Sequence, residues 1–137
     1  MAENTLTSRK MTLFPWLMAG DLITIVLVTL FGFSTHQELD TAGLRMLTTF
    51  LPVLASWLLV APFLGLYQLD KVLEARQLWR PFYAMILAAP MAAFLRGAWL
   101  QRPVVPIFVV VLGGVSALAI LLWRGIFWWI SARGKRA

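Results

Sequence analysis

Four long apolar stretches, separated by short polar segments, dominate the pattern of residues along this chain. They cover about residues 13–33, 46–67, 81–100 and 104–128. The hydrocarbon core of a bilayer is about 30 Å thick, and a helix needs roughly 20 apolar residues to cross it. Because backbone groups in lipid must form their hydrogen bonds within the segment, each stretch is predicted to be a transmembrane α-helix.

The polar connections between these stretches are short, so consecutive helices are predicted to be antiparallel neighbours. We therefore expect an all-α, polytopic membrane protein, an up-down-up-down bundle of four transmembrane helices with both termini on one side. Residues 1–137 are expected to form a single transmembrane domain. The first stretch is interpreted as a retained helix rather than a cleaved signal, because it is long, contains Asp21 and precedes no small-residue cleavage motif.

Composition supports a membrane protein and excludes several soluble classes. Apolar residues make up 61% of the chain and charged residues 13%, whereas about a quarter of the residues in a soluble domain are charged. One core formed by 137 residues cannot hide so large an apolar fraction from water. The absence of cysteine also excludes a disulfide scaffold and a thiolate metal site.

The basic residues are distributed unevenly between the two predicted sides of the membrane. Nine flank the side that holds both termini: Arg9, Lys10, Lys71, Arg76, Arg80, Arg124, Arg133, Lys135 and Arg136. Three lie toward the other side: Arg45, Arg96 and Arg102. The positive-inside rule then places both termini in the cytoplasm, as in a multi-pass protein of the cytoplasmic (inner) membrane. The net charge of +6 is thus interpreted as an orientation signal at anionic headgroups, and nucleic acid is not an expected partner.

Asp21 is the most unusual polar residue in the apolar stretches. It lies about 12 Å into the first predicted helix, where a carboxylate is costly unless it is protonated, paired or facing water. Thr24 is expected on the same helical face, together with Val28 and Gly32. Arg124 is the first candidate for pairing with Asp21, and Arg80 is the second. Two interpretations remain open: an ion pair that fixes the register of the helices, or the exchanging carboxylate of a small transporter.

Three further residues are candidates for a site. Arg96, near the outer end of the third stretch, is expected to extend outward or to meet Glu38 or Asp40. His36 lies in the loop beside these acids, and a solvated loop is a better interpretation than a metal site, so no metal is predicted.

Two tryptophans are interpreted differently. Trp123 is expected in the interfacial aromatic belt, whereas Trp57 lies in the middle of a stretch. The Trp57 indole N–H needs a partner, and the ring is expected either to pack in the bundle or to contact a ligand. No cofactor is predicted, although a pigment or quinone at Trp57 stays a possibility on composition alone.

Small residues at helical spacing indicate close approach of helices. The third stretch carries Ala84, Ala88 and Ala92, and similar pairs are Gly113 with Ala117 and Ala61 with Gly65. They predict helix contacts either within the chain or between copies of it.

Several short motifs, in order and over nearly the whole chain, resemble one known family. They are Ala19-Gly20-Asp21-Leu22, Gly32, His36, Pro52, Trp57, Gly65-Leu66-Tyr67, Leu95-Arg96-Gly97, Pro106-Ile107-Phe108-Val109 and Trp123-Arg124. The chain resembles domain-of-unknown-function family 3054, which consists of small four-span proteins of bacteria and archaea. The resemblance implies four spans and membrane residence and implies no activity. It also groups Asp21, His36, Arg96 and Arg124 as residues of interest.

The sequence favours a function without catalysis. It contains no hydrolase or phosphate-binding motif, so we expect no enzymatic activity. The first hypothesis is an accessory or assembly subunit that packs in the lipid bilayer, as a homo-oligomer or within a larger membrane complex. The alternative is a proton- or cation-coupled transporter that acts as a homodimer, with Asp21 as the coupling carboxylate.

Overall fold

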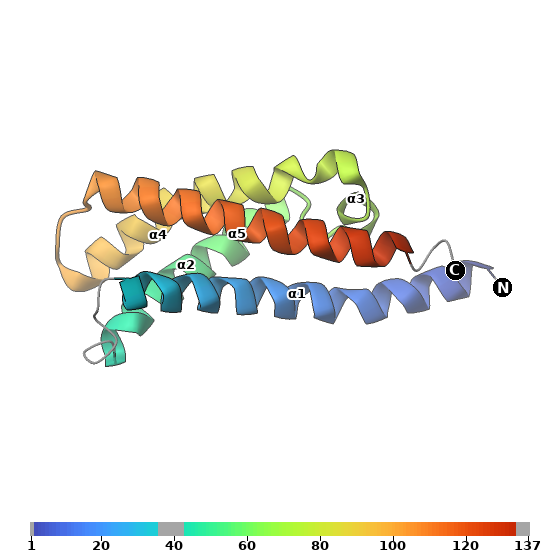
Figure 1. Cartoon of the computed structure of the whole chain (residues 1–137), viewed down its shortest axis with the longest axis horizontal. Coiled ribbons are helices and arrows are strands. Elements are labelled where there is room, and N and C mark those ends of the chain that lie inside the picture. Colours follow the sequence, from blue (N-terminus) through green and yellow to red (C-terminus); the bar gives the residue numbers. More distant parts are fainter. Residues whose placement is uncertain (1, 36–42, 134–137) are drawn as a thin grey trace.

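The described residues form four long helices, and two short helical turns lie between the second and the third of them (Figure 1). The computed structural model describes residues 2–35 and 43–133, and of these the side chains of 2–7, 9 and 10 are left aside. The long helices are α1 (Ala2–Thr35), α2 (Gly43–Phe63), α4 (Trp79–Leu100) and α5 (Pro106–Arg133). Between α2 and α4 lie α3 (Leu69–Val72) and the 3-10 turn η2 (Ala75–Gln77).

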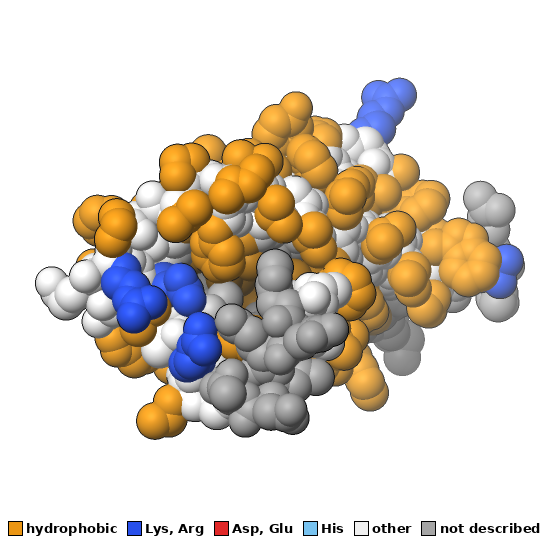
Figure 2. All heavy atoms as spheres, turned by 60° about the vertical axis from the view of Figure 1, so that its left-hand side comes forward, with side chains coloured by type: hydrophobic (Ala, Val, Ile, Leu, Met, Phe, Trp, Pro, Cys, Tyr) orange, Lys and Arg blue, Asp and Glu red, His pale blue; other side chains and the backbone are white. Residues whose placement is uncertain are grey.

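The predicted all-α class is confirmed for the described residues, and four helices of the length and apolarity that a membrane span needs lie where the four apolar stretches were predicted. Each of four helical segments is long and apolar enough to cross a membrane: Met11–Thr35, Gly43–Phe63, Ala75–Leu100 and Pro106–Arg133. Within the described ranges no residue belongs to a strand. On the face shown in Figure 2, hydrophobic side chains cover most of the described surface, with a few basic side chains among them.

The helix ends differ from the limits of the apolar stretches: α1 begins at Ala2, well before residue 13, and α2 ends before its stretch does. The second stretch was predicted to run to Tyr67, but α2 ends at Phe63. Gly65 has φ +68, a left-handed conformation that breaks the helix and that glycine adopts without strain. The backbone N–H groups of Gly65 and Leu66 donate to the carbonyls of Pro62 and Ala61, which closes a tight turn. Hydrophobicity alone could not show this end, because the turn is itself apolar.

The four long helices pack as a ring in which α4 contacts α2 and α5, and α1 contacts the same two helices. The start of α1 and the end of α5 lie at the same end of the bundle as α3 (Figure 1). We call this the α3 end. The opposite end holds the end of α4 at Leu100 and the start of α5 at Pro106.

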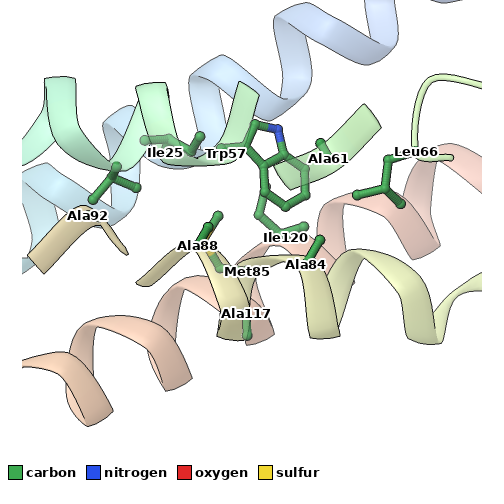
Figure 3. Close-up of a cluster of buried hydrophobic side chains, with 11 residues drawn as sticks. Ile25, Trp57, Ala61, Leu66, Ala84, Met85, Ala88, Ala92, Ala117 and Ile120 are labelled. Atoms are coloured by element: carbon green, nitrogen blue, oxygen red, sulfur yellow. The ribbon is translucent and has the colours of Figure 1, made fainter. Parts of the chain in front are cut away.

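The core lies where α2, α4 and α5 meet, and small residues of α4 allow that meeting. Ala84, Ala88 and Ala92 are buried, as the alanine spacing predicts, and they pack against helices of the same chain. Figure 3 shows the Trp57 ring in the middle of this cluster, close to Ala84 and to Ile120 of α5. Alanine on α4 therefore leaves room for one large ring from α2.

Candidate functional site

The candidate site is a buried ion pair between α1 and α5. Asp21 and Arg124 each expose only 2% of their surface. The guanidinium binds the carboxylate through two bonds: Nε lies 2.9 Å from Oδ1 and Nη2 lies 2.6 Å from Oδ2. This two-point geometry is the strongest arrangement that arginine forms with a carboxylate. Of the two pairing candidates for Asp21, the structure selects Arg124.

Two indole groups complete the environment of the same carboxylate. Trp57 Nε1 on α2 donates to Oδ2 over 3.2 Å, and Trp123 Nε1 on α5 donates to Oδ1 over 3.1 Å. The Arg124 guanidinium carbon also lies 5.9 Å from the centre of the Trp57 ring. Each oxygen of Asp21 therefore accepts two hydrogen bonds, and an ionised carboxylate has about four acceptor positions in all.

Arg124 also holds the turn that follows α2. Its Nη1 donates to the carbonyl of Leu66 over 2.9 Å. Arg80, at the start of α4, donates from Nη1 to the carbonyl of Leu64 over 3.0 Å. The alternative pairing of Arg80 with Asp21 is therefore corrected: Arg80 binds the turn instead. These carbonyls need outside donors because the turn ends the regular bonding of α2.

The face of α1 that meets the bundle differs from the predicted one. Leu17, Asp21, Ile25 and Thr29 are buried at spacings of four, and Gly20 is buried beside Asp21. Thr24 is only half-buried, and its hydroxyl donates to the carbonyl of Gly20 in its own helix over 2.7 Å. Thr24 thus lies at the edge of the face that carries Asp21, and Ile25, one position further along, is the residue that is fully turned toward the core.

Gly20 provides the space in which Trp123 reaches Asp21. A Cβ atom built on Gly20 would lie 1.8 Å from Cζ2 of the Trp123 ring. No side chain fits there, so the indole lies directly against the backbone of α1. Trp123 was expected in the interfacial belt. Its role as a donor was missed, although its position beside Arg124 was a usable signal.

Arg96 lies at a second polar position, toward the opposite end of the bundle. Its Nε donates to the Thr49 hydroxyl of α2 over 3.1 Å, and its guanidinium carbon lies 5.1 Å from the centre of the Phe108 ring. The contact with Thr49 was not predicted. The acids named as partners of Arg96, Glu38 and Asp40, lie outside the described residues, as does His36.

The remaining expectations about the site concern metals and ligands. In the part of the chain that the structure describes, no three His, Cys, Asp or Glu residues lie close enough together to hold a metal ion. Trp57 is fully buried and uses its N–H on Asp21. Its polar group therefore serves the ion pair.

The fold and the buried pair are those of an all-α bundle with a charged contact inside it and four helices long and apolar enough to span a membrane, which is compatible with a multi-pass membrane protein. Within that class, the chain belongs to the family described as "Protein of unknown function (DUF3054)", whose model matches residues 18–127. The matched region contains Asp21, Trp57, Arg96 and Arg124. No curated protein and no solved structure matches the chain.

Proposed function

We propose that this protein is a non-enzymatic accessory or assembly subunit of the cytoplasmic membrane. In this proposal the four helices run up-down-up-down, both termini lie in the cytoplasm, and the bundle packs against a second copy or a larger membrane complex. One observation carries the choice of a structural role over transport: the acceptor positions of Asp21 are filled by Arg124, Trp57 and Trp123.

A coupling carboxylate has to exchange partners and be reached by the ion that it carries. Asp21, on α1, exposes 2% of its surface and is held by donors from two other helices, α2 and α5. Releasing it would leave the Nε and Nη2 groups of Arg124 and the two indole N–H groups without this acceptor, and each unpaired donor inside the bundle carries a large desolvation penalty. The arrangement supports a fixed contact that sets the register of α1 against α2 and α5.

Transport remains the alternative, because acidic residues inside the membrane are functional by default. Asp21 is the sole acidic residue within the four described spans, so coupling through an acid in these spans would depend on it. The test is proton uptake into proteoliposomes that contain the wild-type chain. The matched variant is Asp21→Asn with Arg124→Gln, which removes both charges and keeps hydrogen-bonding groups.

The accessory role predicts the same proton flux for the wild type, the double variant and protein-free vesicles. A flux that requires Asp21 would overturn the accessory role and establish transport. The double variant is preferred to Asp21→Asn alone, since the single change leaves Arg124 buried without its anion.

Assembly is tested on the tagged full chain, extracted from its own membranes in mild detergent. Native mass spectrometry is expected to detect a fixed stoichiometry with a second copy or with other membrane subunits. A monomer that carries only lipid under all extraction conditions would contradict the proposal.

The proposed orientation can be tested directly, because the chain contains no cysteine. Single substitutions Ser8→Cys and Glu74→Cys place thiols at exposed positions at the α3 end, and Arg102→Cys places one at the opposite end. A membrane-impermeant maleimide is expected to label Arg102→Cys in intact cells and the other two only after permeabilisation. The reverse pattern would show that the termini lie outside.

A further inference from the structure

A cavity of about 280 Å³ lies between α1 and α2. Its wall is mostly apolar, with Met18 and Leu22 from α1 and Leu54 and Leu58 from α2. Leu22 and Leu58 are also exposed, so the wall extends to the outer surface of the bundle. Tyr67, from the turn after α2, lines the same cavity. An apolar cavity with a few polar groups is the usual form of a small-molecule site.

The charged group at this wall already has its partners. Asp21 lines the cavity, but its carboxylate accepts two hydrogen bonds from Arg124 and one each from Trp57 and Trp123. The charges of Asp21 and Arg124 therefore compensate each other. A charged ligand beside them would be buried without a counter-ion, at a high desolvation cost. The wall thus favours a neutral ligand.

The Tyr67 hydroxyl differs from Asp21, because it is buried without a partner. Its oxygen is shielded from solvent and forms no hydrogen bond within the part of the chain that the structure describes. The ring is held by Phe14 of α1, which packs edge-on against it with 6.1 Å between the ring centres. A tyrosine hydroxyl keeps its proton at neutral pH and can donate it to an acceptor. Buried polar groups normally have a partner, so an acceptor is missing at this position.

A water molecule is a poor candidate for this acceptor. A buried water typically makes about three hydrogen bonds, whereas the wall near Tyr67 consists of apolar side chains and a carboxylate whose acceptor positions are filled. A carbonyl oxygen on an apolar body needs only one donor. The rest of such a molecule would lie against Leu54, Leu58 and Met18.

We propose that this cavity binds a neutral, apolar molecule whose carbonyl oxygen accepts a hydrogen bond from the Tyr67 hydroxyl. The ring carbonyl of a membrane quinone and the ester carbonyl of a diacyl lipid share this chemistry. The proposal requires no exchange of protons or ions at Asp21, so it stands whether the protein is an accessory subunit or a transporter.

Tyr67→Phe removes the donor and keeps the ring. Because the hydroxyl bonds to no described residue, the unliganded variant is expected to unfold at the same temperature as the wild type or at a higher one. Tyr83→Phe is the matched control. Tyr83 is the other tyrosine of the chain, and it is exposed on α4 and does not line the cavity.

The experiment is thermal unfolding of the delipidated full chain in one detergent, at rising concentrations of three separate probes. Decylubiquinone carries ring carbonyls, dioctanoylglycerol carries ester carbonyls, and decylbenzene carries none. The rise of Tm with probe concentration gives the affinity of each probe.

We expect a carbonyl probe to bind the wild type more tightly than decylbenzene does, and the two carbonyl probes show which source is preferred. In Tyr67→Phe the affinity of that probe should fall by about three- to tenfold, the effect of one hydrogen bond. Its affinity in Tyr83→Phe and the affinity of decylbenzene in both variants should stay unchanged.

Three results would overturn the proposal. The first is equal affinity of the wild type for all three probes, which would mean that no carbonyl is recognised. The second is undiminished binding of the carbonyl probes in Tyr67→Phe, which would place them elsewhere on the bundle. The third is a lower unfolding temperature of unliganded Tyr67→Phe, which would assign the hydroxyl a bond within the chain.

Discussion

The Asp21 carboxylate connects three helices, α1, α2 and α5. Both charges of the ion pair, on Asp21 and on Arg124, are buried. Burying two charges costs several kcal/mol for each ion, and only good geometry with further hydrogen bonds offsets that loss. Here the further bonds come from Trp57, Trp123 and the Leu66 carbonyl. The ion pair is thus stable as a unit. Removing one charge is expected to lower the free energy of unfolding far more than removing both charges.

This difference predicts a pattern across single and double variants. Asp21→Asn leaves Arg124 without its anion and is expected to lower the free energy of unfolding by about 3–5 kcal/mol. Adding Arg124→Gln should restore most of the loss. The measurement is unfolding in mixed micelles of increasing denaturing detergent. Arg102→Gln, at an exposed position, is the control and should change the result by less than about 0.5 kcal/mol. A double variant as unstable as the single one would show that the charge balance is not the cause.

We predict that the bundle requires glycine at position 20 in order to keep the Trp123 ring in place. Gly20→Ala places a methyl group within the Trp123 ring, 1.8 Å from Cζ2, so the ring has to move and lose its bond to Asp21. We expect a loss of about 1–3 kcal/mol in the same unfolding assay, as for an overpacked core. Gly125→Ala meets no atom within 4 Å, and the higher helix propensity of alanine should leave its stability equal or raised. Equal effects of the two changes would refute the role of Gly20.

Part of this site follows from the sequence, and part does not. A lone acid in an apolar stretch with an arginine at the matching depth predicts the pairing of Asp21 with Arg124. The two indole donors depend on rotation of the helices about their axes, which apolar segments do not specify because nearly every face is hydrophobic. The same uncertainty explains why the sequence did not identify Ile25 as the residue next to Asp21 that is buried in the core. The hydrogen bond from Arg124 to the Leu66 carbonyl could not be predicted, because every residue has a backbone carbonyl and the sequence does not single out this one.

On the scale of elements, α4 decides how closely the helices approach. Ala84 and Ala88 have no exposed surface, and they belong to the same buried cluster as Trp57 of α2 and Ile120 of α5. The spacing of these alanines in the sequence predicts close approach of another helix. The structure adds that this helix belongs to the same chain. The end of α2 is harder to predict from the sequence. Gly65 lies within an apolar stretch, so hydropathy alone predicts that the helix continues past it.

Enlarging one of these alanines tests the packing. Ala88→Leu is expected to destabilise the bundle by about 1–3 kcal/mol, because the added atoms have no space between α2 and α4. Ala98→Leu on the same helix adds the same atoms at an exposed position and should change stability by less than about 0.5 kcal/mol. Thermal unfolding of both proteins in the same detergent gives the comparison. A tolerated Ala88→Leu would mean that α4 can shift away from α2.

For the whole molecule, the four described hydrogen bonds that join α1 to α2 and α5 converge on Asp21. Helices inserted separately into a membrane can still associate through packing and polar contacts. We therefore predict that residues 1–42 and 43–137, expressed as two chains, assemble in the membrane and purify together through a tag on either one.

Asp21→Asn in the first chain should reduce the co-purified amount by about tenfold or more. Thr24→Val is the matched control on the same helix, because the Thr24 hydroxyl bonds only to its own helix among the described contacts. Equal yields from both variants would show that apolar packing alone holds α1 in place.

The turn after α2 has a consequence for the order in which the protein is made. Its carbonyls at Leu64 and Leu66 receive their donors from Arg80 and Arg124, residues that leave the ribosome later than α2 itself. Until α5 is inserted, Asp21 and Leu66 both lack the same guanidinium. A chain arrested before residue 124 would therefore hold an unpaired acid and an unpaired carbonyl in lipid. The last of the four long helices to be synthesised thus completes contacts of the first two, and a truncated product lacks them.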